Sequence, residues 1–238
     1  MTPHPSEILK SSLFPPRCVI CNIATNNEKY EAICDSCIRG YTPLSGFSCP
    51  ECGKRIPTLH SICHRTNFLL CASQLYSNRP TEILIQHLKF LYIRSAAIPV
   101  AHMMLQTLNS VIQEIPFDLS KTLLTPIPLA SRRERERGFN QSALLAKEIH
   151  SCIPQLIYAP KILKRIKYEL PQTKTHTQKE RNINLNNAFS ADIPTTIQGL
   201  PIILIDDVYT TGATIKNAVK KLKEKGAGKI IVLVGART

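Results

Sequence analysis

Hydrophobic positions in the last two thirds of the chain alternate between helical spacing and short uninterrupted apolar runs. The segment PTEILIQHLKF places Ile83, Leu84 and Leu88 on one face, which predicts a helix that begins at its proline. Helical spacing recurs in three further segments: residues 96–115, 138–150 and 213–226. Runs of aliphatic residues typical of buried strands lie at residues 121–129, 202–208 and 229–236.

This alternation of strand and helix predicts the fold class. Strands that are aliphatic on both faces must be covered on both faces, which is the situation of a parallel sheet between two layers of helices. We therefore expect an α/β domain with a Rossmann-like parallel sheet flanked by helices. Tryptophan is absent and aromatic residues make up only 6% of the 238 residues, so its core should be aliphatic.

The cysteines divide the chain into two parts. Eight of the nine lie before residue 72, and only Cys152 follows. The sequence thus predicts a small cysteine-rich, zinc-finger module over residues 1–72 and a larger domain over residues 73–238.

Two pairs of cysteines in this module have the spacing of a structural zinc site. Their pattern is C-x2-C, twelve residues, then C-x2-C, and the four residues are Cys18, Cys21, Cys34 and Cys37. Two such turns can place four thiolates tetrahedrally, which suits Zn²⁺ in a closed site.

A second zinc site is predicted from the next pair, Cys49 and Cys52. His60 and Cys63 repeat the two-residue gap and would complete a set of three cysteines and one histidine, with His64 and Cys71 as competing fourth ligands. Cys71 opens a segment of strand character, so packing in the core is its expected role. We expect one or two structural zinc ions.

The stretch PIILIDDVYTTGATI suggests a ligand site. Asp206 and Asp207 end a buried strand, and ligands of parallel sheets bind at the carboxyl ends of strands. The loop that follows leads into a helix, whose free backbone N–H groups can bind a phosphate, and Gly212 allows close approach. Two acids beside a phosphate site suit a ribose 5-phosphate, whose hydroxyls donate to carboxylates.

Charge and hydropathy narrow the class of partner and the compartment. The net charge of +13 favours a polyanion, although a basic solvated surface is the alternative. No apolar run approaches the roughly 18 residues of a membrane span, and the first residues lack the pattern of a secretion signal. These features predict a cytoplasmic protein without a membrane span.

The order of motifs along the whole chain resembles the ComF family (ComFC/GntX-type). The motifs that show the resemblance are FPPRCVIC, the paired C-x2-C turns, HLKF, PIPL with RRERERGFNQ, an R-N pair, IILIDDVYTTGAT and a final ART. The stretch IILIDDVYTTGAT is similar to the phosphoribosyl-pyrophosphate (PRPP) motif of type I phosphoribosyltransferases. The resemblance implies that fold for the larger domain.

The resemblance also implies roles for individual residues. Asp206 and Asp207 would hold the ribose hydroxyls of PRPP and take the catalytic positions. The 5-phosphate would lie in the loop formed by Val208, Thr210, Thr211, Gly212, Ala213 and Thr214.

Cationic residues would bind the pyrophosphate, together with bridging Mg²⁺. The leading residues are Arg133 and Arg137, within residues 132–140, with Arg181 and Lys89 as further contacts. A helical ladder of Arg/Glu ion pairs is the alternative for residues 132–137, a polar surface loop for Arg181, and a surface lysine for Lys89.

The function implied is that of a PRPP-binding, phosphoribosyltransferase-like protein of natural competence. Its expected partners are PRPP, incoming single-stranded DNA and other DNA-uptake or DNA-processing proteins. A salvage enzyme that joins a free base to PRPP is one alternative, and a non-enzymatic nucleic-acid binder regulated by PRPP is another.

Overall fold

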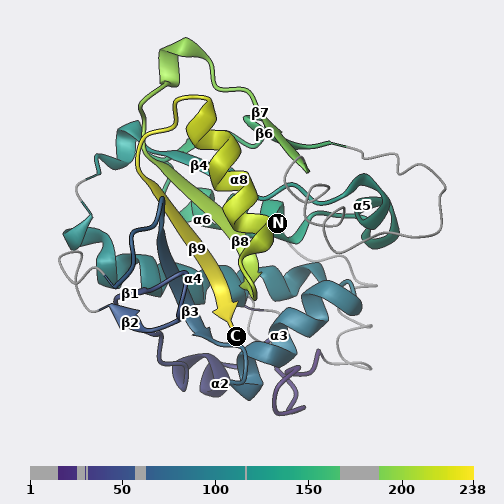
Figure 1. Ribbon diagram of the computed structural model, residues 1–238. Coiled ribbons are helices and arrows are strands. Elements are labelled where there is room, and N and C mark those ends of the chain that lie inside the picture. Colours follow the sequence, from purple (N-terminus) through teal and green to yellow (C-terminus); the bar gives the residue numbers. More distant parts are fainter. Residues whose placement is uncertain (1–15, 26–29, 31, 57–62, 116, 167–187) are drawn as a thin grey trace, which may run out of the picture.

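The fold is described from a computed structural model that covers residues 16–25, 30, 32–56, 63–115, 117–166 and 188–238. A seven-stranded sheet runs through the molecule with helices on both sides (Figure 1). This is the predicted α/β architecture, with a mostly parallel sheet and the cysteine-rich module at its N-terminal end. Within the described residues, no helix combines the length and apolar character that crossing a membrane requires.

The strand order of the sheet is β2-β1-β3-β9-β8-β4-β5. The parallel part consists of β3 (Leu69–Leu75), β9 (Ile230–Arg237), β8 (Ile202–Tyr209), β4 (Leu123–Pro126) and β5 (Ile157–Tyr158). The short strands β1 (Phe47–Ser48) and β2 (Arg55–Ile56) extend it in antiparallel fashion. Because Leu75 and Tyr209 both pair with Arg237, the carboxyl ends of the long strands lie at one edge.

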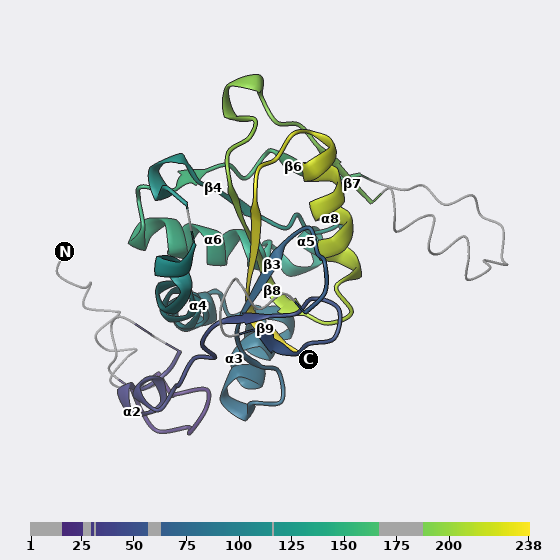
Figure 2. The same cartoon turned by 60° about the vertical axis from the view of Figure 1, so that its left-hand side comes forward.

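Alternate residues of the central strands enter two separate cores. On one face, Ile203 and Ile205 pack with the helices α3 (Arg79–Phe90), α4 (Ala97–Val111) and α6 (Gln141–Cys152). On the other face, Ile202 and Leu204 pack with α8 (Ala213–Glu224) and with the hairpin of β6 (Leu163–Arg165) and β7 (Phe189–Ala191). Figure 2 shows α8 and α4 on opposite sides of the sheet. The aliphatic character of these strands follows from this double burial.

The helices and long strands predicted from periodicity are confirmed, within a few residues at their ends. The periodicity did not predict the short elements, because segments of two to seven residues carry little or no periodic signal; a helix over residues 132–137 was expected only as an alternative. These are α2 (Asp35–Arg39), α5 (Ser131–Arg137), β1, β2, β5, β6, β7 and four 3₁₀ turns at Arg94–Ala96, Ile112–Glu114, Leu119–Lys121 and Thr195–Ile197.

The cysteine-rich module is joined to the sheet rather than hanging from it. Strand β1 of the module pairs with β3, and β3 pairs along its length with β9. Cys71 lies in β3 with none of its surface exposed, which confirms its expected role in core packing.

Candidate functional site

A pocket of about 610 Å³ opens at the carboxyl ends of β4 and β8, which is the size range of small-ligand sites. Eight of the predicted site residues line it: Lys89, Arg133, Arg137, Asp206, Asp207, Val208, Thr210 and Thr214. They come from α3, α5, β8 and α8, so the tertiary fold brings together side chains that are far apart in the sequence.

The two acids form the negative part of this pocket. Asp206 Oδ1 accepts hydrogen bonds from the Ser142 hydroxyl at 2.8 Å and from the Asp207 backbone N–H at 3.0 Å. Asp207 is 8% exposed, and its Oδ1 lies 3.2 Å from Lys89 Nζ. Burial raises the pKa of the Asp206 carboxyl to about 7, and the charge of Asp207 adds to this rise. The two hydrogen bonds and the charge of Lys89 act in the opposite direction and lower the pKa. The site thus holds two neighbouring acids, with Lys89 paired to Asp207 and the charge of Arg165 near Asp206.

Arginines line the opposite side of the pocket. Arg133 and Arg137 lie on α5, where an ion pair between Arg132 and Glu136 at 2.8 Å supports the helix. The structure thus shows one ion pair of the expected helical ladder, and it places Arg133 and Arg137 at the pocket, where pyrophosphate binding stays a prediction. Arg165 of β6 joins them, and burial lowers its pKa, with the nearby charge of Arg133 as a second cause. Closely placed arginines in a partly buried pocket favour an anionic ligand.

Residues of the loop between β8 and α8 line two different pockets. Thr210 and Thr214 line the large pocket, whereas Thr211 does not and its Oγ1 accepts a weak bond from the Ala213 N–H at 3.4 Å. Gly212 has φ +73° and precedes the first turn of α8, where Ala213 contributes backbone only. A Cβ at position 212 would lie 2.1 Å from the Tyr209 hydroxyl oxygen, so both the backbone angle and the close packing require glycine.

Several pocket residues were not found from the sequence. Ser142 and Gln141 begin α6, and Asn140 caps this helix by accepting from the Ser142 N–H at 3.0 Å. Gln141 is 2% exposed, and within the described part of the chain its Nε2 has no hydrogen-bond partner. The motif GFNQ signalled this segment, but a helix cap and a ligand contact look alike in sequence. Arg181 lies outside the described residues, so its role stays a prediction.

The four cysteines of the first predicted zinc site form one cluster. The sulfur atoms of Cys18, Cys21, Cys34 and Cys37 all lie within 4.8 Å of one another, and the Cys21 and Cys34 sulfurs are 3.7 Å apart. Sulfurs that bind zinc at about 2.3 Å from tetrahedral corners would be about 3.8 Å apart, so the cluster fits Zn²⁺. Four protein ligands leave no open position, which makes the site structural.

The second cluster consists of Cys49, Cys52, Cys63 and His64. Cys49 Sγ lies 3.3 Å from His64 Nδ1, and the sulfurs of Cys52 and Cys63 are 3.5 Å apart. His64, one of the competing ligands, therefore completes the set within the described residues. His60, which the two-residue gap favoured, lies outside them.

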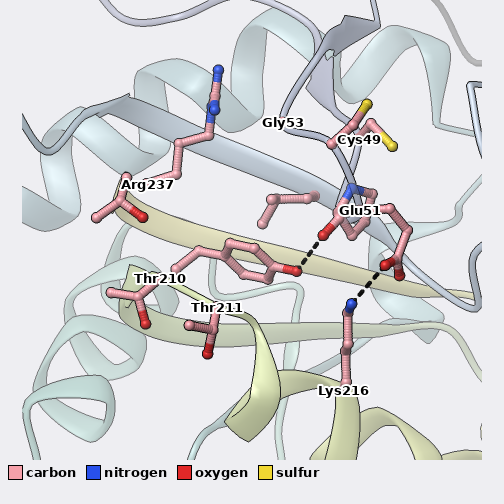
Figure 3. A pocket seen from close by; sticks show the side chains of 12 residues that line it. Cys49, Glu51, Gly53, Thr210, Thr211, Lys216 and Arg237 are labelled. Carbon is pink, nitrogen blue, oxygen red and sulfur yellow. Dashed lines mark hydrogen bonds and ion pairs between the residues drawn. The ribbon is translucent and has the colours of Figure 1, made fainter.

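The turn of the second cluster, residues 49–53, contacts the loop after β8. The Tyr209 hydroxyl donates to the Pro50 carbonyl oxygen at 2.7 Å, and Lys216 Nζ lies 2.8 Å from Glu51 Oε2. Burial raises the pKa of Tyr209 to about 12, so this hydroxyl stays a donor. Figure 3 shows the ion pair between Glu51 of the turn and Lys216 of α8. Both residues line a second pocket of about 310 Å³, together with Thr210 and Thr211.

Comparisons with known proteins agree with the two cysteine-rich clusters. Residues 9–67 match the double zinc ribbon domain, and both clusters lie within this range. Competence protein ComFC of Bacillus subtilis is 30% identical over 215 residues, which cover 82% of this chain and 80% of that protein. The chain belongs to the ComFC family.

Two other relatives match 94% and 64% of this chain. DNA utilization protein YhgH of Salmonella typhimurium is 28% identical over 94% of this chain and 98% of its own. Competence protein F of Haemophilus influenzae is 31% identical over 64% of this chain and 66% of its own. The match with YhgH therefore spans most of both the cysteine-rich module and the α/β domain of this chain.

Proposed function

We propose that this ComFC-family chain is a PRPP-binding, phosphoribosyltransferase-like protein that handles incoming single-stranded DNA in natural transformation. The names of its relatives, competence proteins and DNA utilization proteins, support the biological setting. The net charge of +13 is consistent with a nucleic-acid partner.

The observation that carries the PRPP part is the single pocket that joins Asp206 and Asp207 to Arg133, Arg137 and the start of α8. A molecule that fits this arrangement needs hydroxyls for the two carboxylates and phosphates for the arginines and the helix N-terminus. PRPP carries a vicinal diol between a 5-phosphate and a pyrophosphate, so its groups have the required order.

In this proposal each part of the pocket has one task. Asp206 and Asp207 accept hydrogen bonds from the ribose hydroxyls. Thr210, Thr214 and the first N–H groups of α8 donate to the 5-phosphate. The arginines, with Lys89 and the unpaired amide of Gln141 nearby, bind the pyrophosphate. Mg²⁺ bound to the pyrophosphate would neutralise part of its charge.

If a transfer reaction occurs, the bond from C1 of the ribose to pyrophosphate breaks and the electron pair leaves with the pyrophosphate. The two carboxylates then lie beside a ribose ring that gains positive charge, and the arginines lie beside a leaving group that gains negative charge. The chain contributes positioning and charge stabilisation rather than a nucleophile of its own.

Calorimetry with Mg-PRPP tests the proposal. Asp206→Asn combined with Asp207→Asn should abolish measurable binding, because each change removes the negative charge and replaces one acceptor oxygen for the diol with an NH₂ donor. Asp192→Asn makes the same chemical change at an exposed position outside the pocket, and should bind like the wild type. Equal PRPP affinity in the wild type and the folded double variant would refute the assignment.

The single variant Asp206→Asn provides a control for folding. A raised carboxyl pKa stabilises the fold below the unfolded pKa, and this contribution is lost as the pH rises through about 7. Removing the charge should therefore raise the free energy of unfolding above pH 7 by about 1–3 kcal/mol. A variant that is more stable and yet fails to bind PRPP cannot have lost binding through unfolding.

A pyrophosphate-release assay, with and without single-stranded DNA, distinguishes an enzyme that acts with DNA, a PRPP-regulated DNA-binding protein and a salvage enzyme. Release that depends on DNA indicates a transferase or hydrolase acting with the nucleic acid. Binding without release indicates a PRPP-regulated DNA-binding protein, and release with a free base indicates a salvage enzyme.

A further inference from the structure

Three consecutive apolar residues are exposed directly after Lys89, at the end of α3. Phe90, Leu91 and Tyr92 are 61%, 60% and 48% exposed, and they form the one run of three such residues within the described part of the chain. Phe90 and Tyr92 line the large pocket, whereas Leu91 does not. Lys89, which forms the ion pair with Asp207, is thus followed directly by an aromatic surface at the pocket.

The backbone of Tyr92 is held in an unfavourable conformation. Its φ is +56°, in the left-handed region that favours glycine, and only one other non-glycine residue of the described chain has a positive φ. The turn is fixed by a hydrogen bond from the Ile93 N–H to the His87 carbonyl oxygen at 3.1 Å. A bulky side chain retained at such a position, and left half exposed, is a feature that points to function.

One arginine contacts this aromatic surface directly, and further arginines lie on the neighbouring helix α5 and in the same turn. Arg137 Cζ lies 5.9 Å from the centre of the Phe90 ring. Arg94 lies 5.1 Å from the Phe139 ring centre and donates to the Gly138 carbonyl oxygen at 2.9 Å, so it ties this turn to the end of α5. The exposed Arg132, Arg133 and Arg135 extend the positive charge along α5, where Glu134 and Glu136 are the opposing acids.

Exposed aromatic rings beside arginines have the chemistry that binds single-stranded nucleic acid. Bases stack on aromatic rings, phosphates bind arginine, and neither contact requires a particular sequence. We propose that Phe90 and Tyr92 form a base-stacking platform for single-stranded DNA at the entrance of the large pocket, with the arginines of α5 binding its phosphates. The inference names the DNA-contacting residues of the proposed function and rests on its DNA-binding part, not on PRPP.

Fluorescence anisotropy with labelled oligothymidine over a series of salt concentrations tests the platform. Stacking contributes enough for Phe90→Ala with Tyr92→Ala to weaken binding by about 5- to 150-fold for each base lost. The salt dependence should keep its slope, because the phosphate contacts remain. Phe90→Trp should retain binding, since tryptophan also stacks.

Leu91→Ala is the control, because it truncates a neighbouring apolar side chain of similar fractional exposure in the same turn without removing a ring. It should bind oligothymidine like the wild type. Equal loss in this variant would show that general apolar contact, and not ring stacking, carries the binding, and it would overturn the proposal. Wild-type affinity in the double aromatic variant, or no binding by the wild type, would also overturn it.

The variant Asp206→Asn with Asp207→Asn separates this inference from the PRPP proposal. Its platform is intact, so its oligothymidine affinity should be no weaker than that of the wild type while PRPP binding is lost. If the wild type binds DNA through the platform and does not bind PRPP, only the PRPP proposal fails. Loss of DNA binding in this variant would contradict the platform as a separate contact surface.

Discussion

The two metal clusters have similar ligand spacing but different neighbours. The first lies beside the helical layer, where Cys18, Ile33 and Ile38 share an apolar core with Leu84 of α3 and residues of α4. In both views α2 lies beside α3 (Figures 1 and 2). The second cluster contacts the loop after β8 through Pro50 and Glu51. One cluster thus supports packing, while the other also touches the proposed phosphate loop.

This difference suggests that the second cluster fixes the position of the loop as well as its own turn. Tyr209 precedes Thr210 and packs against Gly212, so a shift of the turn at Pro50 would move residues on both sides of the phosphate position. The first cluster has no such contact with this loop among the described residues. PRPP affinity should therefore respond to the second cluster more than to the first.

The largest expected effect comes from removing one ligand of each cluster. Cys21→Ser and Cys52→Ser both change an exposed cysteine, and each should release one zinc ion and lower stability strongly, because metal binding contributes directly to folding. Only Cys52→Ser should also weaken PRPP binding, on the order of tenfold or more, through the loss of the contacts to Tyr209 and Lys216. The zinc content and the PRPP affinity of both variants are measured below their unfolding temperatures. Equal PRPP affinities would contradict a special role of the second cluster in positioning the loop.

A smaller effect is expected from single hydroxyl groups. Tyr209→Phe removes the bond to Pro50, and Tyr41→Phe removes a similar bond of 2.6 Å to the Ser73 carbonyl oxygen, far from the loop in sequence. Each should lower the free energy of unfolding by about 1 kcal/mol. The Tyr209 variant alone should lose PRPP affinity, by about two- to tenfold. A parallel loss in the Tyr41 variant would mean that affinity simply follows stability.

The contrast between the clusters also shows what sequence could predict. The cysteine pairs and the two acids at a strand end are local signals, since their spacing fixes the geometry over a few residues. The choice between His60 and His64 was not local in this sense, because it depends on how the turn after Cys63 folds back toward Cys49. The sequence therefore predicted a second site with several candidate fourth ligands, of which His64 lies in the cluster within the described residues.

The pocket residues on other elements could not be predicted for a similar reason. Ser142 bonds to Asp206, which is 64 positions away, and Arg165 reaches the pocket from a three-residue strand. Their roles depend on how α6 and β6 pack beside β8, which no pattern within a segment specifies. The exposure of Phe90 and Tyr92 is equally a property of the folded surface.

The smallest expected effect concerns the ion pair between Lys216 and Glu51, whose side chains are 40% and 43% exposed. Glu51→Gln should lower the free energy of unfolding by about 0.2–1 kcal/mol at low salt. Glu224→Gln, which breaks the pair with Lys221 on the same helix, should also lower it slightly. Charge alone predicts that both variants bind anionic PRPP slightly more tightly. If the pair helps to hold α8 against the second cluster, Glu51→Gln should instead bind PRPP more weakly, while Glu224→Gln does not. Tighter binding by Glu51→Gln would leave the Tyr209 bond as the contact that couples the cluster to the loop.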